Sequence, residues 1–334
     1  MIIKKEKKGN IMVYVIEKKI KTKNTELIKN QFLDRNNIDL LIDHDADVYN
    51  EDNKLLLKFR KDILPKENIN VFYDNVIRFA RNITSNRGNA TGNNTKKRNV
   101  KNNPKIMSNI FGYYDSWGPA HKLIFKNLNI KAPNPVHETR FLKEHPNKFK
   151  KCIPLIKNID NLYKNLIPKE YNSQKKKANK TYFKIDNTSF TTITTNINYQ
   201  TSIHIDKGDD LEGFGNLTVI EKGGTYEGSE TCFPRYGIGV DVRTGDMLFM
   251  DVHEWHGNLP MINKKPDTIR LSLVCYLRTK IYDLTKNMSK KESLKHINYV
   301  NSIFEKNKQN KKTEKLNKKN EKLNKKRKTK KRKN

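Results

Sequence analysis

Two short segments of the sequence carry side chains that could bind one metal ion together. TSIHIDKGDD places His204 and Asp206 one residue apart, after a stretch rich in β-branched residues. Residues i and i+2 of a strand point to the same face, so these two side chains would project into the same space. About fifty residues later, DVHEWHGNLP adds His253 and His256. Each of these residues alone is more simply explained as a solvated polar side chain, but the ordered set predicts a metal site.

His256 is the better candidate for the second histidine ligand. It precedes GNLP, a tight-turn sequence, and its spacing to Arg270 fits better than that of His253. We expect His253 to pack or orient another group beside the site. Two imidazoles and one carboxylate supply three adjacent ligands and leave three positions open, which is the facial triad of non-haem Fe(II) oxygenases.

A later strand, DTIRLSLVCY, could bind an organic acid beside this metal. Arg270 and Ser272 share one face of the strand. A planar guanidinium binds a carboxylate through two parallel hydrogen bonds, and Ser272 could donate another. The order H-x-D, H, R-x-S therefore predicts Fe(II), a chelating keto acid as cosubstrate and O₂ at an open position. A metal-binding cupin without redox chemistry would leave Arg270 without a role.

The elements that would position these residues are mostly short strands. Segments such as SFTTITTN, TSIHI, NLTVIE and TIRLSLVCYL, together with TYFKI, GIGVDV and DMLFMDV, are separated by turns. This spacing predicts a sandwich, jelly roll or barrel rather than a parallel sheet. Apolar residues at helical spacing predict amphipathic helices over 68–83, capped by Asn68, and over 145–167, with Pro154 near the start. The expected fold class is α+β, with helices that buttress a β-core.

The positive charge of the chain is concentrated at its C-terminal end. The 334 residues have a formal net charge of +32 and a hydrophobic content of 35%. Residues 306–334 hold sixteen Lys/Arg and two Glu, a net charge of +14. We expect a short helix over 286–305 and then a disordered Lys-rich tail. The tail is either a polyphosphate-binding or nuclear-targeting segment or a solubilising terminus.

Cysteine use and hydropathy indicate a soluble intracellular protein. Cys152, Cys232 and Cys275 are odd in number and far apart, so they form neither a disulfide framework nor a C-x-x-C zinc pattern. The N-terminal residues lack the apolar core of a signal peptide, and no apolar run is long enough to cross a bilayer.

Several blocks of the sequence resemble the TET/JBP family of 2-oxoglutarate- and Fe(II)-dependent dioxygenases, which oxidise the 5-methyl group of thymine or 5-methylcytosine in DNA. The blocks are TTITTNINYQTSIHIDKGD, GFGNLTVIEKGGTYEG, FPRYGIGVDVRTGDMLFMDVHEWHGNLP and TIRLSLVCY, with GYYDSWGPA and ETRFLKEHPNKFKKCIPLI upstream. They cover about residues 110–280. Nothing in the sequence resembles the cysteine-rich zinc-binding region of animal TET enzymes, so no structural zinc is expected.

The resemblance implies a double-stranded β-helix of the jelly-roll or cupin type. It implies that His204, Asp206 and His256 bind Fe(II), and that Arg270 and Ser272 bind 2-oxoglutarate; Arg140 is a further possible contact. The chain then divides into an N-terminal extension (1–65), a dioxygenase domain (66–285, helical over 66–180 and β over 181–280), a short helix (286–305) and the tail (306–334).

DNA is the partner that the resemblance and the charge imply, with the methylated pyrimidine flipped out of the duplex. The polar loop 84–105, the segment NSQKKKANK (172–180) and the tail would hold the backbone, and the protein would be nuclear or otherwise DNA-associated. Tyr226, Phe233 or Tyr236 would stack on the base.

Two other functions are left open by the residues alone. The same iron chemistry could act on a protein side chain or on RNA, because the triad and the arginine do not distinguish these substrates. A protein of another class, a catalytically inactive basic DNA-binding protein, would have no need of the complete set of ligands. Consumption of 2-oxoglutarate would separate that protein from an enzyme.

Overall fold

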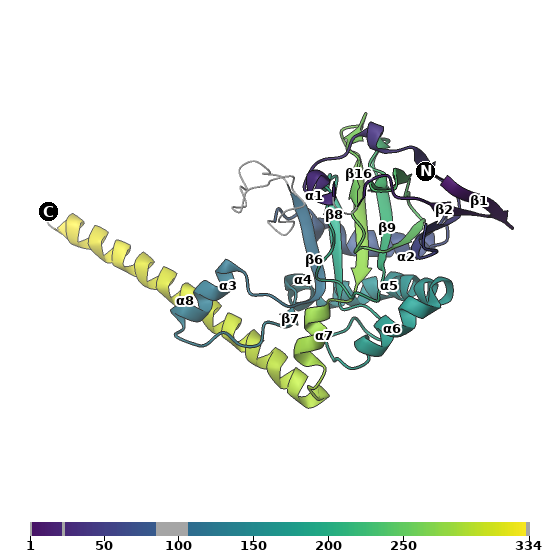
Figure 1. The fold of residues 1–334 in the computed structure, drawn as a ribbon. Helices are drawn as coiled ribbons and strands as arrows, with labels where there is room; N and C mark the ends of the chain where they lie inside the picture. Colours follow the sequence, from purple (N-terminus) through teal and green to yellow (C-terminus); the bar gives the residue numbers. More distant parts are fainter. Residues whose placement is uncertain (1, 22–23, 85–105, 332–334) are drawn as a thin grey trace.

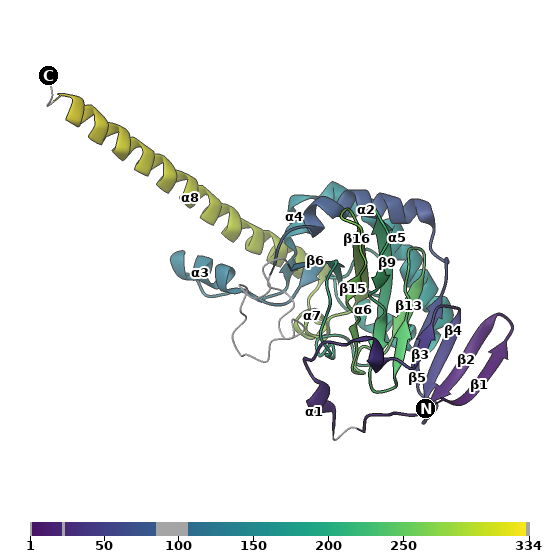
Figure 2. The same ribbon diagram turned by 90° about the horizontal axis from the view of Figure 1, so that it is seen from above.

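The architecture is built on two β-sheets that face each other, with helices on the outer side of the larger sheet (Figures 1 and 2). The computed structural model describes residues 2–21, 24–84 and 106–331. The larger sheet has ten strands in the order β1-β2-β4-β5-β13-β9-β16-β8-β6-β7, and the smaller has four in the order β14-β11-β12-β3. A third pair, β10 and β15, stands alone. The α+β class expected from the sequence is confirmed.

The bounds of the elements are as follows. The larger sheet contains β1 (Ile2–Lys8), β2 (Ile11–Ile16), β4 (Ala46–Asn50), β5 (Leu55–Arg60), β6 (Met107–Tyr114), β7 (His137–Glu138), β8 (Thr192–Ile197), β9 (Gly215–Lys222), β13 (Met247–Met250) and β16 (Ile269–Tyr276). The others are β3 (Leu40–Ile42), β10 (Glu227–Gly228), β11 (Thr231–Phe233), β12 (Ile238–Val240), β14 (Gly257–Asn258) and β15 (Met261–Ile262). The helices are α1 (Thr25–Ile28), the 3₁₀ turn η2 (Arg35–Asn37), α2 (Lys66–Ala80), α3 (Pro119–Asn127), α4 (Arg140–Glu144), α5 (Pro146–Leu166), α6 (Pro168–Ala178), α7 (Thr279–Thr285) and α8 (Lys290–Lys331).

Alternation along β16 explains how the two faces of the larger sheet differ. Leu271, Leu273 and Cys275 belong to the cluster that packs under the helices α2 and α5. Val274 packs instead against the cluster between the two sheets, and Arg270 has the same parity in the strand. Because successive side chains of a strand point to opposite faces, Arg270 and Ser272 project toward the space between the sheets.

The two predicted helices are present. The prediction over 68–83 corresponds to α2, whose buried residues recur at helical spacing; Pro65, rather than Asn68, stands at its N-cap position. The prediction over 145–167 corresponds to α5, and Pro154 lies inside it without ending it. The cluster that both helices share buries several large apolar side chains, each of which stabilises the fold by about 1.5–3 kcal/mol.

Three predicted segments differ in the structure. TYFKI and TSIHI are not strands; in the second, only His204 makes an isolated bridge, with His256. NSQKKKANK lies largely in α6 and is not a loop, because Pro168 starts a helix whose Tyr171 and Gln174 are buried against the body. In TSIHI, the pairing with His256 therefore outweighed the local β-propensity. In NSQKKKANK, the burial of one helix face outweighed the local polarity.

The predicted division of the chain also differs. Residues 1–65 are not a separate extension, because β5 pairs with β13 and β3 pairs with β12. At the other end, one 42-residue helix, α8, replaces the short helix and the disordered tail. The sequence of α8 contains neither Gly nor Pro, and its commonest residue is Lys, which favours helix. In the described part of the chain, no helix has both the length and the apolar character needed to cross a membrane.

Candidate metal centre

Backbone pairing between two irregular segments brings the predicted metal ligands together. The N–H of His204 donates to the carbonyl of His256 and the N–H of His256 to that of His204, both at 2.9 Å. The N–H of Asp206 donates to the carbonyl of Val252 at 3.0 Å. Directly paired residues point their side chains to the same face, and the two imidazole centroids lie 4.5 Å apart.

The three side chains direct their ligand atoms at one small space. Nε2 of His204 lies 3.7 Å from Oδ1 of Asp206, and Nε2 of His256 lies 3.7 Å from Oδ2 of the same carboxylate. One ligand atom from each residue lies within 4.8 Å of the others. Ligands about 2.1 Å from a common ion are roughly 3 to 4 Å apart, so the arrangement is suited to one divalent cation.

Hydrogen bonds fix the two imidazole rings in the orientation that a metal ligand needs. Nδ1 of His204 lies 2.7 Å from the carbonyl of Ser202, and Nδ1 of His256 lies 2.9 Å from the carbonyl of Glu254. A carbonyl only accepts, so each Nδ1 carries the proton and each Nε2 presents a lone pair toward Asp206. Glu254 is itself held by two hydrogen bonds of 3.1 Å from Nη1 of Arg235.

Arg270 is a buried cation whose guanidinium has no anionic partner in the described residues. Its exposed fraction is 6%, and its Nε makes no hydrogen bond. Glu221, opposite it on β9, is taken by Arg243 at 3.2 Å and by the N–H of Thr244 at 2.8 Å. Burial of an unpaired charge is costly, so this position fits an anionic ligand that is supplied from outside the chain.

Ser272 and Asn196 extend the same polar patch. Ser272 is buried, and its Oγ accepts a hydrogen bond of 3.3 Å from the amide of Asn196. The Oδ1 atom of Asn196 is buried and has no hydrogen-bond partner in the structure. Together with Nε of Arg270, it is a polar atom that a ligand rich in oxygen could satisfy, directly or through water.

The candidate metal ligands lie close to the space between the two sheets that Arg270 faces. The ring of Phe233, which belongs to the cluster between the sheets, lies 6.5 Å from that of His256. Tyr276 has the same parity as Arg270 in β16; burial raises its pKa, and the carboxylate charges of Asp209 and, to a smaller extent, Asp206 add to that effect. The donor set and the arginine therefore fit a site for a cation and an acid.

The structure places the remaining candidates away from this role. Tyr226 is 8% exposed and lies under Arg243, 4.5 Å from ring centroid to guanidinium carbon; burial raises its pKa to about 12. Phe233 is fully buried, and Tyr236 donates to Glu254 at 3.4 Å, so none of the three is exposed for stacking on a base. Arg140 is exposed on α4 and pairs with Glu144 at 3.0 Å.

His253 does not join the ligand set. Its Nε2 lies 3.1 Å from the carbonyl of Asp210, and its backbone N–H donates to Asp251. This agrees with the expectation that it packs or orients a neighbouring segment. Asn196, and Asn198, whose Oδ1 accepts a hydrogen bond of 2.7 Å from the backbone N–H of Arg270, were not predicted. Their alternation in TTITTNIN, on the face opposite the isoleucines, was a usable signal.

A family model described as the oxygenase domain of the 2OGFeDO superfamily (Tet_JBP) matches residues 109–279, more than half of the chain. The chain belongs to the TET/JBP family. Its domain is therefore that of a dioxygenase that uses Fe(II) and 2-oxoglutarate, as the superfamily's name states. The match includes all five residues singled out in the sequence, from His204 to Ser272.

Similar proteins cover the same part of the chain. The bifunctional helicase and thymine dioxygenase JBP2 of Leishmania tarentolae is 33% identical over 189 residues, which are 57% of this chain and 16% of that protein. The thymine dioxygenase JBP1-B of Trypanosoma cruzi is 29% identical over 174 residues, 52% of this chain and 19% of that protein. The chain thus spans less than a fifth of the length of these relatives.

The solved structures that match this chain have low sequence identity to it. NgTET1 in complex with 5mC DNA has a TM-score of 0.49 and 14% identity, and covers 84% of this chain and 88% of its own. A viral collagen prolyl hydroxylase from Paramecium Bursaria Chlorella virus-1 has a TM-score of 0.31 and 14% identity, and covers 66% and 94%. No substrate assignment follows from similarity at this level.

Proposed function

We propose that this protein hydroxylates the 5-methyl group of thymine or 5-methylcytosine in DNA, with Fe(II), 2-oxoglutarate and O₂. The observation that carries the proposal is the convergence of His204, Asp206 and His256, together with a buried arginine on the inner face of the larger sheet that has no anionic partner in the described residues. A cation site and an acid site in one space are what this chemistry requires. The thymine dioxygenases among the relatives make thymine the first base to test.

The proposed core is a double-stranded β-helix. Two facing sheets, a shared apolar cluster between them and ligand-bearing segments at one end of that space support this assignment. Strands contributed by residues 40–60 complete both sheets, so the core extends beyond the part that matches the family.

Each residue of the site has a defined task in the proposed reaction. Nε2 of His204, Nε2 of His256 and the carboxylate of Asp206 hold the metal. When bound, Fe(II) with 2-oxoglutarate and O₂ supplies the oxidising power that an unactivated methyl group requires. Arg270 binds the far carboxylate of 2-oxoglutarate through its fork of donors, and Ser272 donates a further hydrogen bond to it.

The protein surroundings exclude water from the acid-binding end. Leu217, Val219 and Val274 line the larger sheet on the face that carries Arg270. A buried charge pair is less screened than an exposed one, so the guanidinium binds a carboxylate more strongly here than at a surface. Asp206 is 33% exposed at its side chain, which leaves the metal end accessible to a substrate.

The methyl group of a paired base cannot reach a site between two sheets. The base must leave the duplex, at a cost of a few kcal/mol of unstacking. Of the basic segments expected to hold the DNA backbone, 85–105 lies outside the described residues, while 172–178 forms the last turns of α6. Association with DNA is the proposed location of the protein.

The test is mass spectrometry of nucleosides after incubation with Fe(II), ascorbate, 2-oxoglutarate and duplex DNA that contains thymine and 5-methylcytosine. We expect 5-hydroxymethyluracil or 5-hydroxymethylcytosine with the natural protein and with His253→Ala, and neither product with His204→Ala. His253 is the matched control because it lies outside the ligand set. Products that persist with His204→Ala would refute the assignment.

The same incubation separates the alternatives. Consumption of 2-oxoglutarate without a modified base would retain the iron site and direct the search to protein or RNA substrates. No consumption by a protein that still binds duplex DNA would favour the inactive DNA-binding protein.

A further inference from the structure

The helix α8 has two parts with different surroundings. In its first part, Val300, Ile303 and Phe304 pack with Trp117 and Phe125, which joins the helix to α3. The side chain of Asn301 donates to Glu138 at 3.0 Å. From Lys306 onward, no hydrogen bond or ion pair within the described residues joins α8 to the body, and the helix projects away from both sheets (Figures 1 and 2).

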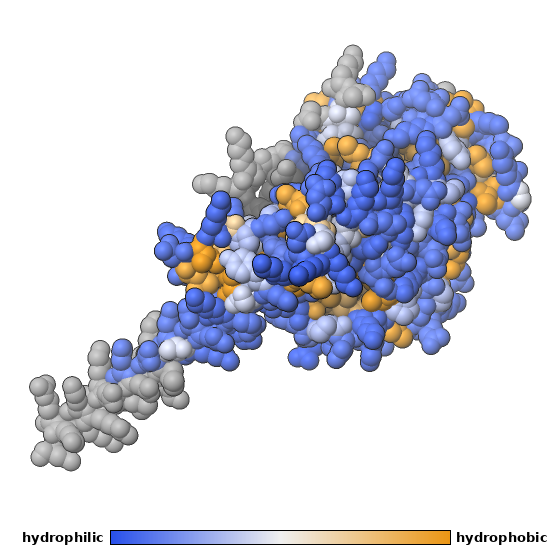
Figure 3. All heavy atoms as spheres, turned by 90° about the horizontal axis from the view of Figure 1, so that it is seen from below, coloured by the Kyte–Doolittle hydropathy of each residue, from blue (hydrophilic) through white to orange (hydrophobic). Residues whose placement is uncertain are grey.

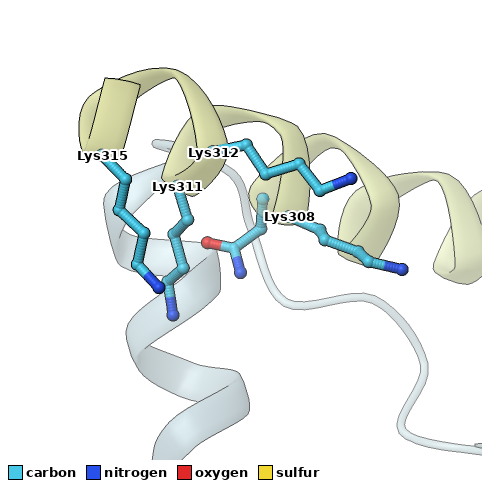
Figure 4. A pocket seen from close by; sticks show the side chains of 5 residues that line it. Lys308, Lys311, Lys312 and Lys315 are labelled. Carbon is cyan, nitrogen blue, oxygen red and sulfur yellow. The ribbon is translucent and has the colours of Figure 1, made fainter. Parts of the chain in front are cut away.

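The projecting part concentrates lysines on one face. Lys308, Lys311, Lys312 and Lys315 stand at positions i, i+3, i+4 and i+7, which lie on one side of a helix. Figure 4 shows them in two adjacent pairs, Lys311 beside Lys315 and Lys308 beside Lys312. The sequence repeats the same spacing with lysines at 315, 318, 319 and 322.

Acidic residues are few in this part of the helix. Glu314 and Glu321 are the only ones in the sequence after Glu305, and at about 100° per residue they stand about 120° and 140° around the helix from Lys308. Glu314, three residues after Lys311, borders the lysine face. Lys311, Lys312 and Lys315 are exposed and form no ion pair within the described residues. Like charges at i and i+4 destabilise a helix by a few tenths of a kcal/mol per pair, so a ligand that neutralises this face would stabilise α8.

We propose that this lysine face of α8 binds the phosphate backbone of nucleic acid, as a contact additional to the active site. Its residues 306–331 span about 39 Å, which is close to one turn of a DNA duplex. Lysine acts as a point charge rather than a fork, so the contact is independent of sequence. The choice of nucleic acid over another polyanion rests on the proposed function.

Two other occupants fit less well. A membrane-bound helix needs an apolar face, but residues 306–331 contain only Leu316 and Leu323 as large apolar residues. One leucine every seven residues is also too little for a coiled coil with a second copy. Figure 3 shows the described part of the projecting helix as almost entirely hydrophilic on the face in view.

The experiment compares two variants of the full chain with equal loss of charge. In the first, Lys308, Lys311, Lys312 and Lys315 become Gln; in the second, the exposed Lys4, Lys5, Lys7 and Lys8 of β1 become Gln. Binding of a fluorescent duplex of about 30 base pairs, roughly three helical turns, is measured by anisotropy at several salt concentrations.

We expect the α8 variant to bind at least tenfold more weakly, with a log–log salt dependence that is shallower by about 3 to 4, because four phosphate contacts are lost. The β1 variant should bind within threefold of the natural protein. Equal losses in both variants, or no loss in the α8 variant, would overturn the proposal.

Two further arms identify the partner. Polyglutamate and vesicles of phosphatidylserine and phosphatidylcholine are offered to the same proteins, and tighter binding of either than of the duplex through α8 would overturn the choice of nucleic acid. The assay measures equilibrium binding, so it is independent of turnover. If the α8 variant loses duplex binding while the natural protein yields no oxidised base, this inference is supported and the proposed function is refuted.

Discussion

Arg270 is the residue whose surroundings most directly suggest the ligand proposed for it. Its guanidinium is buried, while the neighbouring carboxylate of Glu221 is bound to Arg243 and Thr244. Burial alone would raise the pKa of Glu221, but the contacts with Tyr226, Thr244 and Arg243 outweigh it and lower that pKa. Glu221 is thus ionised and already compensated, and the charge of Arg270 is left for a ligand.

The first prediction concerns the replacement Arg270→Met, which keeps an unbranched apolar stem and removes the charged guanidinium. Without 2-oxoglutarate, the variant should be as stable as the natural protein or about 1 kcal/mol more stable, because an unpaired buried charge is removed. Mn²⁺ is present in all samples. Addition of 2-oxoglutarate at about 100 times its dissociation constant should raise the free energy of unfolding of the natural protein by about 2.7 kcal/mol and leave that of the variant unchanged.

Thermal unfolding with and without 2-oxoglutarate measures both effects. Ser272→Ala is the matched control, since it removes one donor from the same strand and should retain part of the gain. A variant that is still stabilised by 2-oxoglutarate to the natural extent would exclude Arg270 as the acid-binding residue.

For single residues, the sequence predicted the side chains that could bind a metal, but it did not predict the backbone pairing that brings them together. His204, Asp206 and His256 were predicted as a set, and their donor atoms converge. The reason given for the convergence was wrong, because the segment 201–205 is not a strand and the alignment comes from pairing with His256. That pairing depends on partners fifty residues away, which a local pattern does not contain.

At the scale of elements, an N-terminal segment supports the backbone that carries the proposed metal ligands. The N–H of Asn30 donates to the carbonyl of Ile203, and the N–H of Ile203 donates to that of Gln31, at 2.9 and 2.8 Å. Leu33 packs with Ile203 in a cluster that also includes Trp255. Ile203 and Trp255 are the chain neighbours of His204 and His256, so this segment constrains both histidine ligands.

The second prediction is that Leu33→Ala weakens metal binding as well as folding. The side chain is 3% exposed, so the replacement should cost about 3 kcal/mol of stability. Loss of support behind the ligands should weaken Mn²⁺ binding by about tenfold. Leu64→Ala is the control: Leu64 is equally buried but belongs to the cluster under the helices.

Mn²⁺ titration followed by electron paramagnetic resonance measures the affinity, and urea unfolding measures the stability. Equal effects of both replacements on the affinity would mean that Leu33 acts through global stability alone. An effect confined to Leu33 would assign it a positioning role.

The third prediction concerns the junction of α3, β7 and α8, where buried histidines make folding dependent on pH. His137 stacks on Trp117 with 4.3 Å between centroids, and its Nδ1 lies 2.7 Å from the carbonyl of Pro135. Burial lowers its pKa from 6.5 to about 4. Burial also lowers the pKa of His121, which lies beside it.

The direction of the effect follows from where protons bind. Below about pH 6.5, His137 is protonated in the unfolded chain but stays neutral in the folded protein. The free energy of unfolding therefore falls as the pH drops from about 6.5 to 4, by up to about 3 kcal/mol. His137→Phe, which keeps a ring against Trp117, should flatten the dependence. Urea unfolding at several pH values measures it, and an unchanged slope in the variant would contradict the assignment to His137.

At the scale of the whole molecule, the sequence predicted the class of the fold but not its limits. The polar N-terminal 65 residues offered few core patterns, yet their strands complete both sheets, because β5 and β3 pair with β13 and β12, far along the chain. Conversely, the Lys-rich end was expected to be disordered on composition alone, whereas it continues the helix α8, whose preceding turns pack on α3 through Val300, Ile303 and Phe304.

The fourth prediction tests these limits by truncation from each end. A chain without residues 306–334 should unfold at nearly the temperature of the full chain, since no hydrogen bond or ion pair in the described part of the structure joins that segment to the body. A chain without residues 1–60 should show no cooperative transition. It would lose the pairing of β13 with β5 and the buried residues of the cluster between the sheets that come from this segment: Tyr14, Ile16, Ile42, Ala46, Val48, Leu56, Leu57 and Phe59.

Differential scanning calorimetry decides between the two divisions of the chain. If residues 66–285 were an independent domain, the chain that starts at residue 61 would unfold cooperatively and near the natural temperature. The paired strands argue otherwise, because removal of β5 leaves β13 as an unprotected edge and opens the cluster that lies behind the metal ligands. The same truncated chain should therefore also fail to bind Mn²⁺, although all three proposed ligands are present in it.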